Sequence, residues 1–223
     1  MEYGYWGFKG RGQPHRILIA YLGLNIPEVS FSTPQQWAAK KQELKTGSQC
    51  PFPNLPYFKD GQTIVTESLA VAEAIAFKAN RPELFGKSPS DKITHSTLFS
   101  VYSDIFETWL KLLGSTKSEV QASWPATVEN VIRPKLEGFV KVLGDNKLLL
   151  HYFTYADILL SYVSELFEFL SKHTGVANPI KEFPVLVAHR KFVLNLPGII
   201  DFQSHPHNKT PVVINELAKY TTS

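Results

Sequence analysis

The chain has 223 residues, of which 43% are hydrophobic and 19% are charged, and its net charge is +3. This composition excludes a disordered chain, which needs fewer apolar residues and more net charge. Lys and Arg are spread along the chain, so we expect no nucleic-acid partner. The single cysteine, Cys50, excludes an intrachain disulfide and a multi-cysteine zinc site, and the seven histidines show no metal-ligand spacing. We therefore expect no metal.

The hydropathy pattern gives no sign of export or membrane insertion. Met1–Trp6 carries an acid and lacks the basic and then apolar run of a signal peptide. The longest apolar candidate, residues 158–170, is interrupted by serine and glutamate and falls short of the ~18 residues that a membrane span requires. We expect a cytoplasmic protein with no membrane span.

The first part of the chain alternates short strands with helices. Asp60-Gly61 suits the two-residue turn of a hairpin, and Pro14 and Gly23 mark the start and end of a helix. The order βαβαββα predicts an α/β domain over residues 1–84. Strands are predicted over 3–8, 28–31, 55–59 and 62–66, and helices over 13–22, 35–44 and 68–78.

Strand patterns disappear after Asp91, and Pro82, Gly86 and Pro89 mark a boundary in residues 80–90. An all-α domain is predicted over residues 91–223. A short helix is expected from Pro197, followed by an irregular tail after Ser204. The longer helices are predicted over 92–113, 118–143, 155–172 and 184–194, the second of them kinked or split by Pro125 and Pro134.

Thr154 and Asp157 form a capping-box pattern ahead of an apolar run, with Asp157 in the place of the usual glutamate. We assign this pair a structural role.

Two features of the first domain could bind an anion. Tyr5 follows Gly4 within the first predicted strand, and a tyrosine hydroxyl at the end of a strand can stabilise an anion by donating a hydrogen bond, although a core aromatic is the commoner explanation. Trp37 and Lys41 lie four residues apart on a polar helix, so they share one face. Together they could clamp a carboxylate, although an exposed surface pair is the commoner explanation.

Two further features lie at the ends of the hairpin strands. Pro56 stands where a strand should start, and a cis Leu55-Pro56 bond would offer the Leu55 backbone to a peptide-like ligand. From spacing alone a trans bond is favoured. Glu67-Ser68 lies at a strand-to-helix junction, where free N–H groups hold carboxylates, although Ser68 could serve only as a helix cap.

These features in their order resemble a cytosolic glutathione transferase over nearly the whole chain. Gly4-Tyr5-Trp6, with Gly10, Gln13-Pro14 and Arg16, is similar to the mu-class signature. The rest of the resemblance rests on Trp37 with Lys41, Phe52 to Tyr57, Glu67-Ser68, the Thr154 to Asp157 box and the tail from Thr210-Pro211 to Leu217–Tyr220. Glu67 departs from the mu pattern, which usually has Gln there, so the class stays open.

The resemblance implies a thioredoxin-like domain that binds glutathione, followed by a helical domain that supplies a hydrophobic substrate pocket and dimer contacts. Tyr5 would donate a hydrogen bond to the glutathione sulfur and favour its thiolate. Leu55, before a cis Pro56, would pair with the cysteinyl backbone, with Asn54 close by. The other implied contacts are Trp6, Trp37 and Lys41 to the glycyl carboxylate, Ser68 to the γ-glutamyl carboxylate and Glu67 to the glutamyl end.

The resemblance also implies a homodimer, in which Asp104 of one subunit reaches the glutamyl amine bound to the other. Tyr102 and Trp109 would line the pocket for the second substrate. The implied activity is conjugation of glutathione to hydrophobic electrophiles, as in detoxification. The alternative is a structural or assembly subunit of a larger complex, because a fold alone does not establish function.

Overall fold

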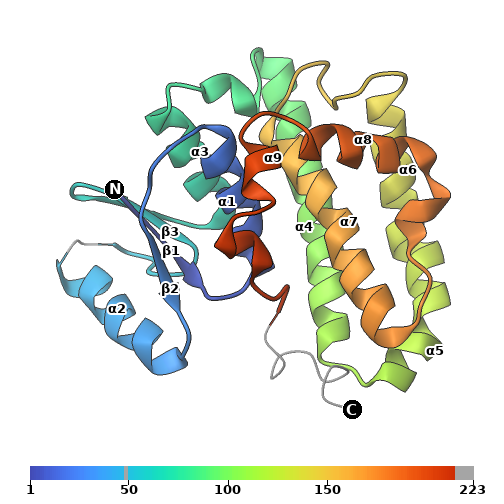
Figure 1. Ribbon diagram of the computed structural model, residues 1–223, viewed down its shortest axis with the longest axis horizontal. Coiled ribbons are helices and arrows are strands. Elements are labelled where there is room, and N and C mark those ends of the chain that lie inside the picture. Colours follow the sequence, from blue (N-terminus) through green and yellow to red (C-terminus); the bar gives the residue numbers. More distant parts are fainter. Residues whose placement is uncertain (48–49, 214–223) are drawn as a thin grey trace. The chain divides into compact units, whose positions relative to one another are not determined.

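The chain forms two compact units in the computed structural model, which describes residues 1–47 and 50–213. The first unit comprises Met1–Pro82 together with Pro197–Pro211, and the second is built from Glu83–Leu196. A mixed sheet with helices forms the first, and in its described residues the second is helical (Figure 1). This confirms the predicted fold class. The sequence analysis did not foresee that Pro197–Pro211 packs with the sheet-containing unit.

The sheet has four strands in the order β2-β1-β3-β4 (Figure 1). β1 is parallel to β2 and antiparallel to β3, and β3 is antiparallel to β4. The central strands β1 and β3 are therefore each paired on both sides, which fixes the positions of their residues. The strands are β1 (Glu2–Trp6), β2 (Glu28–Phe31), β3 (Tyr57–Asp60) and β4 (Thr63–Thr66).

The hairpin turn lies one residue later than predicted. Asp60 stays in the ladder opposite Thr63, so the two-residue loop is Gly61–Gln62 rather than Asp60-Gly61. Gly61 has φ +59°, a conformation that glycine adopts without the Cβ clash of other residues. The loop thus starts at the residue best able to turn the chain.

The three longer helices of the first unit are α1, α2 and α3, of which α1 and α3 pack side by side (Figure 1). α3 also packs on β3 and β4, while α2 packs on β2. The predicted loop after α2 includes residues 48–49, which lie outside the described residues. The helices are α1 (Gln13–Tyr21), α2 (Pro34–Gly47) and α3 (Ser68–Lys78).

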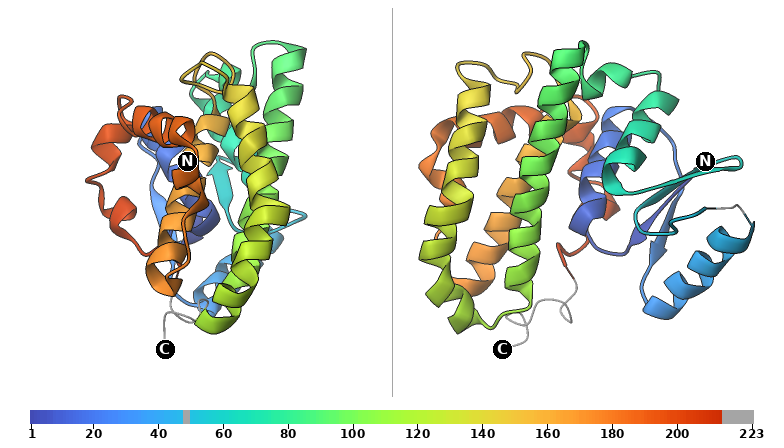
Figure 2. Two further views of the ribbon diagram at one scale, coloured as in Figure 1. Left: turned by 90° about the vertical axis from the view of Figure 1, so that its right-hand side faces the viewer. Right: turned by 180° about the vertical axis from the view of Figure 1, so that it is seen from behind.

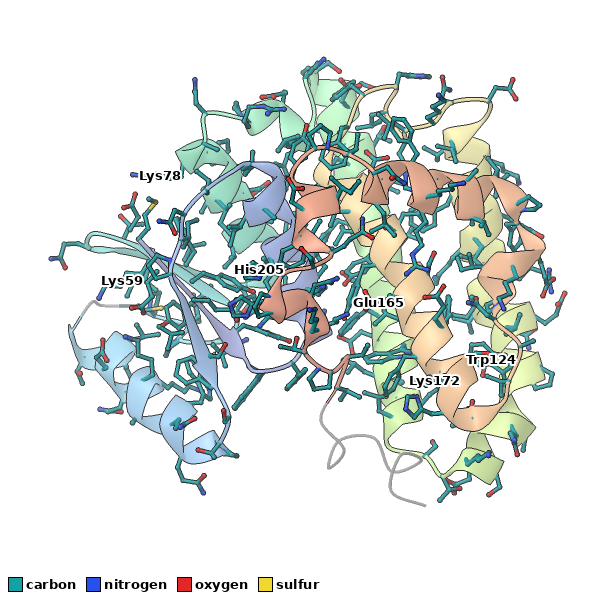
Figure 3. All side chains as sticks on the ribbon, viewed as in Figure 1. Lys59, Lys78, Trp124, Glu165, Lys172 and His205 are labelled. Atoms are coloured by element: carbon teal, nitrogen blue, oxygen red, sulfur yellow. The ribbon has the colours of Figure 1, made fainter. Side chains whose placement is uncertain are left out.

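The segment Pro197–Pro211 returns to the first unit and packs on α1 through the short helix α9 (Ile199–Phe202). Gly198 permits this approach, because a Cβ there would lie 2.6 Å from the Ala20 carbonyl oxygen. His205 lies beside α1 (Figure 3) and stacks on Phe202. A short 3₁₀ helix follows at Pro206–Lys209, where the sequence predicted irregular chain. The motif residues Leu217–Tyr220 lie outside the described residues.

The second unit is a set of packed helices in which α4 and α7 lie side by side (Figures 1 and 2). α7 also contacts α5 and α8, and it is buried along most of its length. No helix in the described part of the chain is long and apolar enough to cross a membrane. The helices are α4 (Pro89–Leu113), α5 (Lys117–Thr127), α6 (Arg133–Leu143), α7 (Tyr155–Thr174) and α8 (Pro184–Leu194).

The helix predicted over 118–143 is split, as the two prolines indicated. A π-helical turn, Val128–Ile132, separates α5 from α6, and the Arg133 N–H donates to the Val128 carbonyl. Pro134 has no N–H to donate one turn back, so the regular α-helical bonding pattern cannot continue through this point. The two halves still run on from one another (Figure 2).

The start of α7 is fixed by a buried carboxylate. Asp157 accepts hydrogen bonds from the Thr154 N–H at 2.8 Å, the Thr154 hydroxyl at 3.0 Å and the Leu149 N–H at 2.9 Å. His189 of α8 adds a contact of 3.0 Å from Nε2 to the same carboxylate. The predicted capping box is confirmed, and it also ties the preceding loop and α8 to this helix.

Replacing this carboxylate should be costly. In Asp157→Ala the N–H groups of Leu149 and Thr154 lose their buried acceptor, and each unsatisfied group costs about 1–3 kcal/mol. We expect the free energy of unfolding in urea to fall by about 3 kcal/mol or more. Asp145→Ala, at an exposed position, is the matched control and should change it by less than about 0.5 kcal/mol. Equal losses in both variants would contradict this account of Asp157.

Candidate functional site

The register of the sheet brings several predicted functional residues of the first unit to one end of its strands. Gly4 of β1 lies opposite Tyr57 of β3, and Tyr57 lies opposite Thr66 of β4. Just beyond this row, Tyr5 follows Gly4, Pro56 precedes Tyr57 and Glu67 follows Thr66. Residues far apart in sequence thus meet at one end of the sheet.

Tyr5 is almost completely buried, with 5% of its surface exposed. Its hydroxyl oxygen accepts a hydrogen bond from the Arg11 N–H at 2.8 Å. Burial raises the pKa of Tyr5 to about 12, so the hydroxyl keeps its proton at neutral pH. The ring leaves no room for a side chain at Gly12, where a Cβ would lie 2.3 Å from a ring carbon. Tyr5 can therefore act as a fixed hydrogen-bond donor.

The loop after β1 is held by Arg16, which projects from α1. Its guanidinium donates to the carbonyl oxygens of Trp6 at 2.9 Å and Phe8 at 2.8 Å. Glu28 of β2 pairs with it at 2.6 Å, and both side chains are nearly fully buried. The guanidinium also lies 5.7 Å from the centre of the Tyr5 ring. This buried ion pair fixes the backbone on either side of Gly7 and places the guanidinium against the Tyr5 ring.

Trp6, Trp37 and Leu55 pack against one apolar cluster, which contains the buried side chains of Phe31 and Tyr57. The Trp37 ring is stacked on Tyr57 with an interplanar angle of 18° and meets Phe31 edge to face. The cluster therefore brings together three residues that the sequence analysis singled out separately. Lys41 lies one turn after Trp37 on α2 and is exposed.

A charged contact anchors α2 beside this cluster. The Tyr57 hydroxyl donates to the Glu2 carboxylate at 2.5 Å, and Lys40 of α2 reaches the same carboxylate at 3.3 Å. Burial, followed by the hydrogen bond to Glu2, raises the pKa of Tyr57 well above its ordinary value. Tyr57 thus stays a donor, and it holds the helix that carries Trp37 and Lys41 through both its ring and its hydroxyl.

The segment before β3 has the geometry that the resemblance implied. The Leu55-Pro56 peptide bond is cis. Asn54 Oδ1 accepts from the Leu55 N–H at 2.9 Å, and Asn54 Nδ2 donates to Glu67 at 3.1 Å. A peptide ligand that accepted a hydrogen bond from the Leu55 N–H would have to replace Asn54 Oδ1 as its acceptor. Asn54 links this segment to the start of α3.

Glu67 is a non-glycine residue in a rarely populated backbone conformation, with φ 70° and ψ 130°. Such a conformation costs about 1–3 kcal/mol and tends to occur where a site needs a particular geometry. Within the described residues, no side chain caps the N-terminus of α3. Ser68 is the first residue of that helix and is half-buried. The first-turn N–H groups of α3 and the Ser68 hydroxyl could together hold a carboxylate.

His15 of α1 is fully buried behind this junction. Its Nε2 lies 2.8 Å from the Ser68 carbonyl oxygen, and its Nδ1 lies 3.3 Å from the Tyr3 hydroxyl. Burial lowers the pKa of His15 to about 4, so the ring is neutral at pH 7. A carbonyl can only accept, so the ring donates to Ser68 when its proton is on Nε2.

Comparison with known proteins agrees with this arrangement. Residues 1–76 match the family "Glutathione S-transferase, N-terminal domain". The chain is 28% identical over 206 residues to the glutathione S-transferase class-mu 26 kDa isozyme of Schistosoma mansoni, an alignment that covers 90% of this chain and 87% of the relative. Residues 1–76 therefore carry a glutathione S-transferase N-terminal domain, and the chain as a whole is similar to glutathione S-transferases.

Two other relatives show how the similarity is distributed. Glutathione S-transferase of Plasmodium falciparum is 25% identical over 208 residues, which cover 89% of this chain and 92% of the relative. Glutathione S-transferase Mu 4 of mouse is 31% identical over 112 residues, which cover 47% and 48%. The relatives with class names are mu-class proteins, so the chain is mu-like at a level of about 28–35% identity.

The predicted functional residues of the helical unit lie on α4. Asp104 is exposed and pairs with Lys135 of α6 at 3.0 Å. Trp109 is 1% exposed and its indole N–H donates to the Leu166 carbonyl at 3.1 Å. Tyr102 is 4% exposed and contacts neighbouring rings of the same helix. These contacts account for both aromatic side chains as core residues. That they line a substrate pocket stays a prediction, as does the contact of Asp104 with the glutamyl amine bound to another subunit.

The sequence analysis assigned no role to His15 or to the pair of Arg16 and Glu28, although it quoted Arg16 as part of the signature. The pattern around them is that of an ordinary amphipathic helix start. One signal was present in the sequence: two adjacent ionisable residues, His15 and Arg16, precede the apolar run Ile17-Leu18.

The buried His15 predicts a dependence of stability on pH. An imidazole with pKa 6.5 in the unfolded chain and about 4 in the folded chain binds more protons when unfolded, so stability is lost as pH falls from about 6.5 toward 4. The loss is at most about 1.4 kcal/mol per pH unit for each such group. Glutamine does not titrate, so urea unfolding should show the advantage of wild type over His15→Gln shrinking across that interval. A difference independent of pH would refute a neutral buried His15.

Proposed function

We propose that this protein is a glutathione transferase that conjugates the glutathione thiolate to hydrophobic electrophiles, with Tyr5 as the catalytic residue. The observation that carries the proposal is the Tyr5 hydroxyl, which is buried, protonated at neutral pH and held by the Arg11 N–H. Accepting that bond polarises the O–H group and strengthens it as a donor. One donor fixed in this way can stabilise an anionic sulfur without rearranging.

The chemical need for such a donor follows from the thiol. A free thiol has a pKa of about 8.5 and is mostly protonated at neutral pH, whereas the thiolate is the nucleophile. A hydrogen bond from Tyr5 to the sulfur favours the anion and lowers the thiol pKa, so that the thiol proton is released to water while the proton of the hydroxyl stays on Tyr5. The thiolate then forms the new C–S bond while the leaving group departs or the acceptor double bond takes up the electron pair.

The remaining groups of the first unit account for the rest of the tripeptide. The Leu55 backbone would pair with the cysteinyl residue, with Asn54 exchanging its bond to the Leu55 N–H. Ser68 and the first turn of α3 would take the γ-glutamyl carboxylate, and Glu67 the glutamyl amine. The glycyl carboxylate would lie against Trp6, Trp37 and Lys41. No metal takes part in this proposal.

The proposed enzyme is a homodimer in the cytoplasm that acts in detoxification. Asp104 of one subunit would reach the glutamyl amine bound to the other. Its ion pair with Lys135 would then be replaced by one with that ammonium group. Tyr102 and Trp109 would line the helical side of the pocket for the electrophile. The matching N-terminal domain and the mu-like relatives support these assignments.

The thiolate absorbance of bound glutathione, measured against pH, tests Tyr5 without a choice of electrophile. In Tyr5→Phe the thiolate loses a charge-assisted hydrogen bond worth about 1.5–3 kcal/mol, so the thiol pKa should rise by about 1–2 units. Turnover at neutral pH should fall about ten- to a hundredfold.

Tyr21→Phe is the matched control. It also removes one phenol hydroxyl from the first unit and keeps the ring on which Arg81 lies at 5.7 Å. Its bound thiol should titrate as in wild type. A wild-type protein that does not lower the thiol pKa, or a Tyr5→Phe variant that titrates like wild type, would remove the enzymatic role of Tyr5.

The second candidate is a catalytically minor subunit of a larger complex, since the fold alone does not establish activity. Retention on immobilised glutathione, followed by size determination of the eluted protein, distinguishes the two. We expect retention and elution as a dimer, because a complete set of glutathione contacts has a candidate residue in this chain. Failure to be retained, together with recovery in a large assembly from its own cells, would favour the structural function.

A further inference from the structure

We propose that His15 is a positioning residue for the γ-glutamyl carboxylate: its imidazole holds the Ser68 carbonyl and so fixes the first turn of α3, where that carboxylate binds. The inference rests on the proposed function for the identity of the ligand. It concerns a side chain that does not touch the ligand and that acts through Ser68.

The contact itself is short and buried. His15 Nε2 lies 2.8 Å from the Ser68 carbonyl oxygen, and His15 has no exposed surface. A carbonyl oxygen has two lone pairs, so it can accept from His15 in addition to the helical N–H one turn ahead. The bond is made between residues 53 positions apart, so it joins α1 directly to the start of α3.

The other side of the His15 ring contacts the central strand β1, and so connects the start of α3 to the sheet. His15 Nδ1 faces the Tyr3 hydroxyl at 3.3 Å, and the two ring centres lie 5.7 Å apart. Tyr3 is on β1, where it pairs with both β2 and β3, and Tyr5 follows two residues later on the same strand. His15 therefore fixes the first turn of α3 relative to the strand that carries the sulfur-binding hydroxyl.

The start of α3 needs support of this kind. In the described chain this helix has no side-chain N-cap, and the preceding residue, Glu67, has φ 70°. A strained residue keeps such a conformation only where its surroundings over-determine it. Asn54 holds the Glu67 carboxylate at 3.1 Å from the exposed side, and His15 holds the Ser68 carbonyl from the buried side. The junction is clamped between these two bonds.

Histidine suits this position for two reasons. Its rigid ring reaches Tyr3 and Ser68 at once, whereas an amide side chain can keep the donor to Ser68 with less constraint. Burial lowers the pKa of His15 to about 4, so near neutral pH the ring donates without adding a charge beside the carboxylate site. His15 therefore positions the N–H groups of α3 and does not itself attract the carboxylate. Those N–H groups and Ser68 bind it.

The experiment compares His15→Leu and His15→Gln with wild type, using glutathione and the dipeptide Cys-Gly as probes. Glutathione should bind His15→Leu about tenfold more weakly, because its carboxylate meets a displaced helix start, and His15→Gln should stay within about threefold of wild type. Cys-Gly lacks the γ-glutamyl group and should bind all three proteins alike. The pKa of the bound glutathione thiol should not change, because Tyr5 is intact.

His95→Leu is the matched control, since it removes another buried imidazole, 2% exposed, from the helical unit. It should lower stability without changing the affinity for glutathione. Equal affinity of wild type and His15→Leu for glutathione, or an equal loss for Cys-Gly, would overturn the role of His15. If wild type itself fails to bind glutathione, the proposed function falls and this assignment falls with it.

A second measurement separates the two ideas and needs no ligand. Amide hydrogen exchange of residues 68–72 in the unliganded His15→Leu protein should be faster than in wild type, with His15→Gln close to wild type and little change in helix α7. Unchanged exchange would refute the clamp even if glutathione binds. Faster exchange in a protein that does not bind glutathione would show that the clamp exists and that the proposed ligand is wrong. If His15→Leu does not fold, His15→Asn, whose amide side chain is one methylene shorter than that of glutamine, replaces it in both measurements.

Discussion

The pairing of β1 with β3, and of β3 with β4, is the constraint on which the candidate site depends. One row of partners, Gly4, Tyr57 and Thr66, lines up the strand ends so that Tyr5, Pro56 and Glu67 are neighbours across the sheet. A slip of one residue would turn every side chain on a strand to the other face. The register is fixed on both sides of the row, by the Gly61–Gln62 turn at one end and by the bond from the Thr66 hydroxyl to the Phe52 carbonyl at the other.

Side chains that do not reach the candidate ligand hold the ones that do. Tyr57 supports α2 through its ring and through Glu2, while Arg16 holds the carbonyls of Trp6 and Phe8 on either side of Gly7. These supports are buried, and burial favours the neutral form of Tyr57, whose pKa is raised, as it does for His15, whose pKa is lowered. A neutral side chain can be buried without an ion partner, whereas a buried charge needs one. The buried guanidinium of Arg16 is accordingly paired with the Glu28 carboxylate.

The sequence predicted elements well where local signals were strong. The bounds of β2, α3 and α8 match because alternation or proline and serine at the first turn marks them. β1 was predicted to reach Phe8 and ends at Trp6, because the Arg16 guanidinium and the bond from the Lys9 N–H to the Pro211 carbonyl turn the chain. The return of Pro197–Pro211 to the sheet-containing unit was also missed. Both depend on partners far away in sequence, which no local pattern encodes.

The same distinction separates the predicted from the missed residues of the site. Tyr5, Trp37 and Ser68 could be singled out because each stands at a recognisable place: a strand end, a helix face or a helix start. His15 could not, because polar residues in the first turn of an amphipathic helix usually face solvent. Its burial follows from Tyr3 and Ser68, which are 12 and 53 residues away. A residue whose role is to fix the distance between two elements becomes visible only once both elements have been placed.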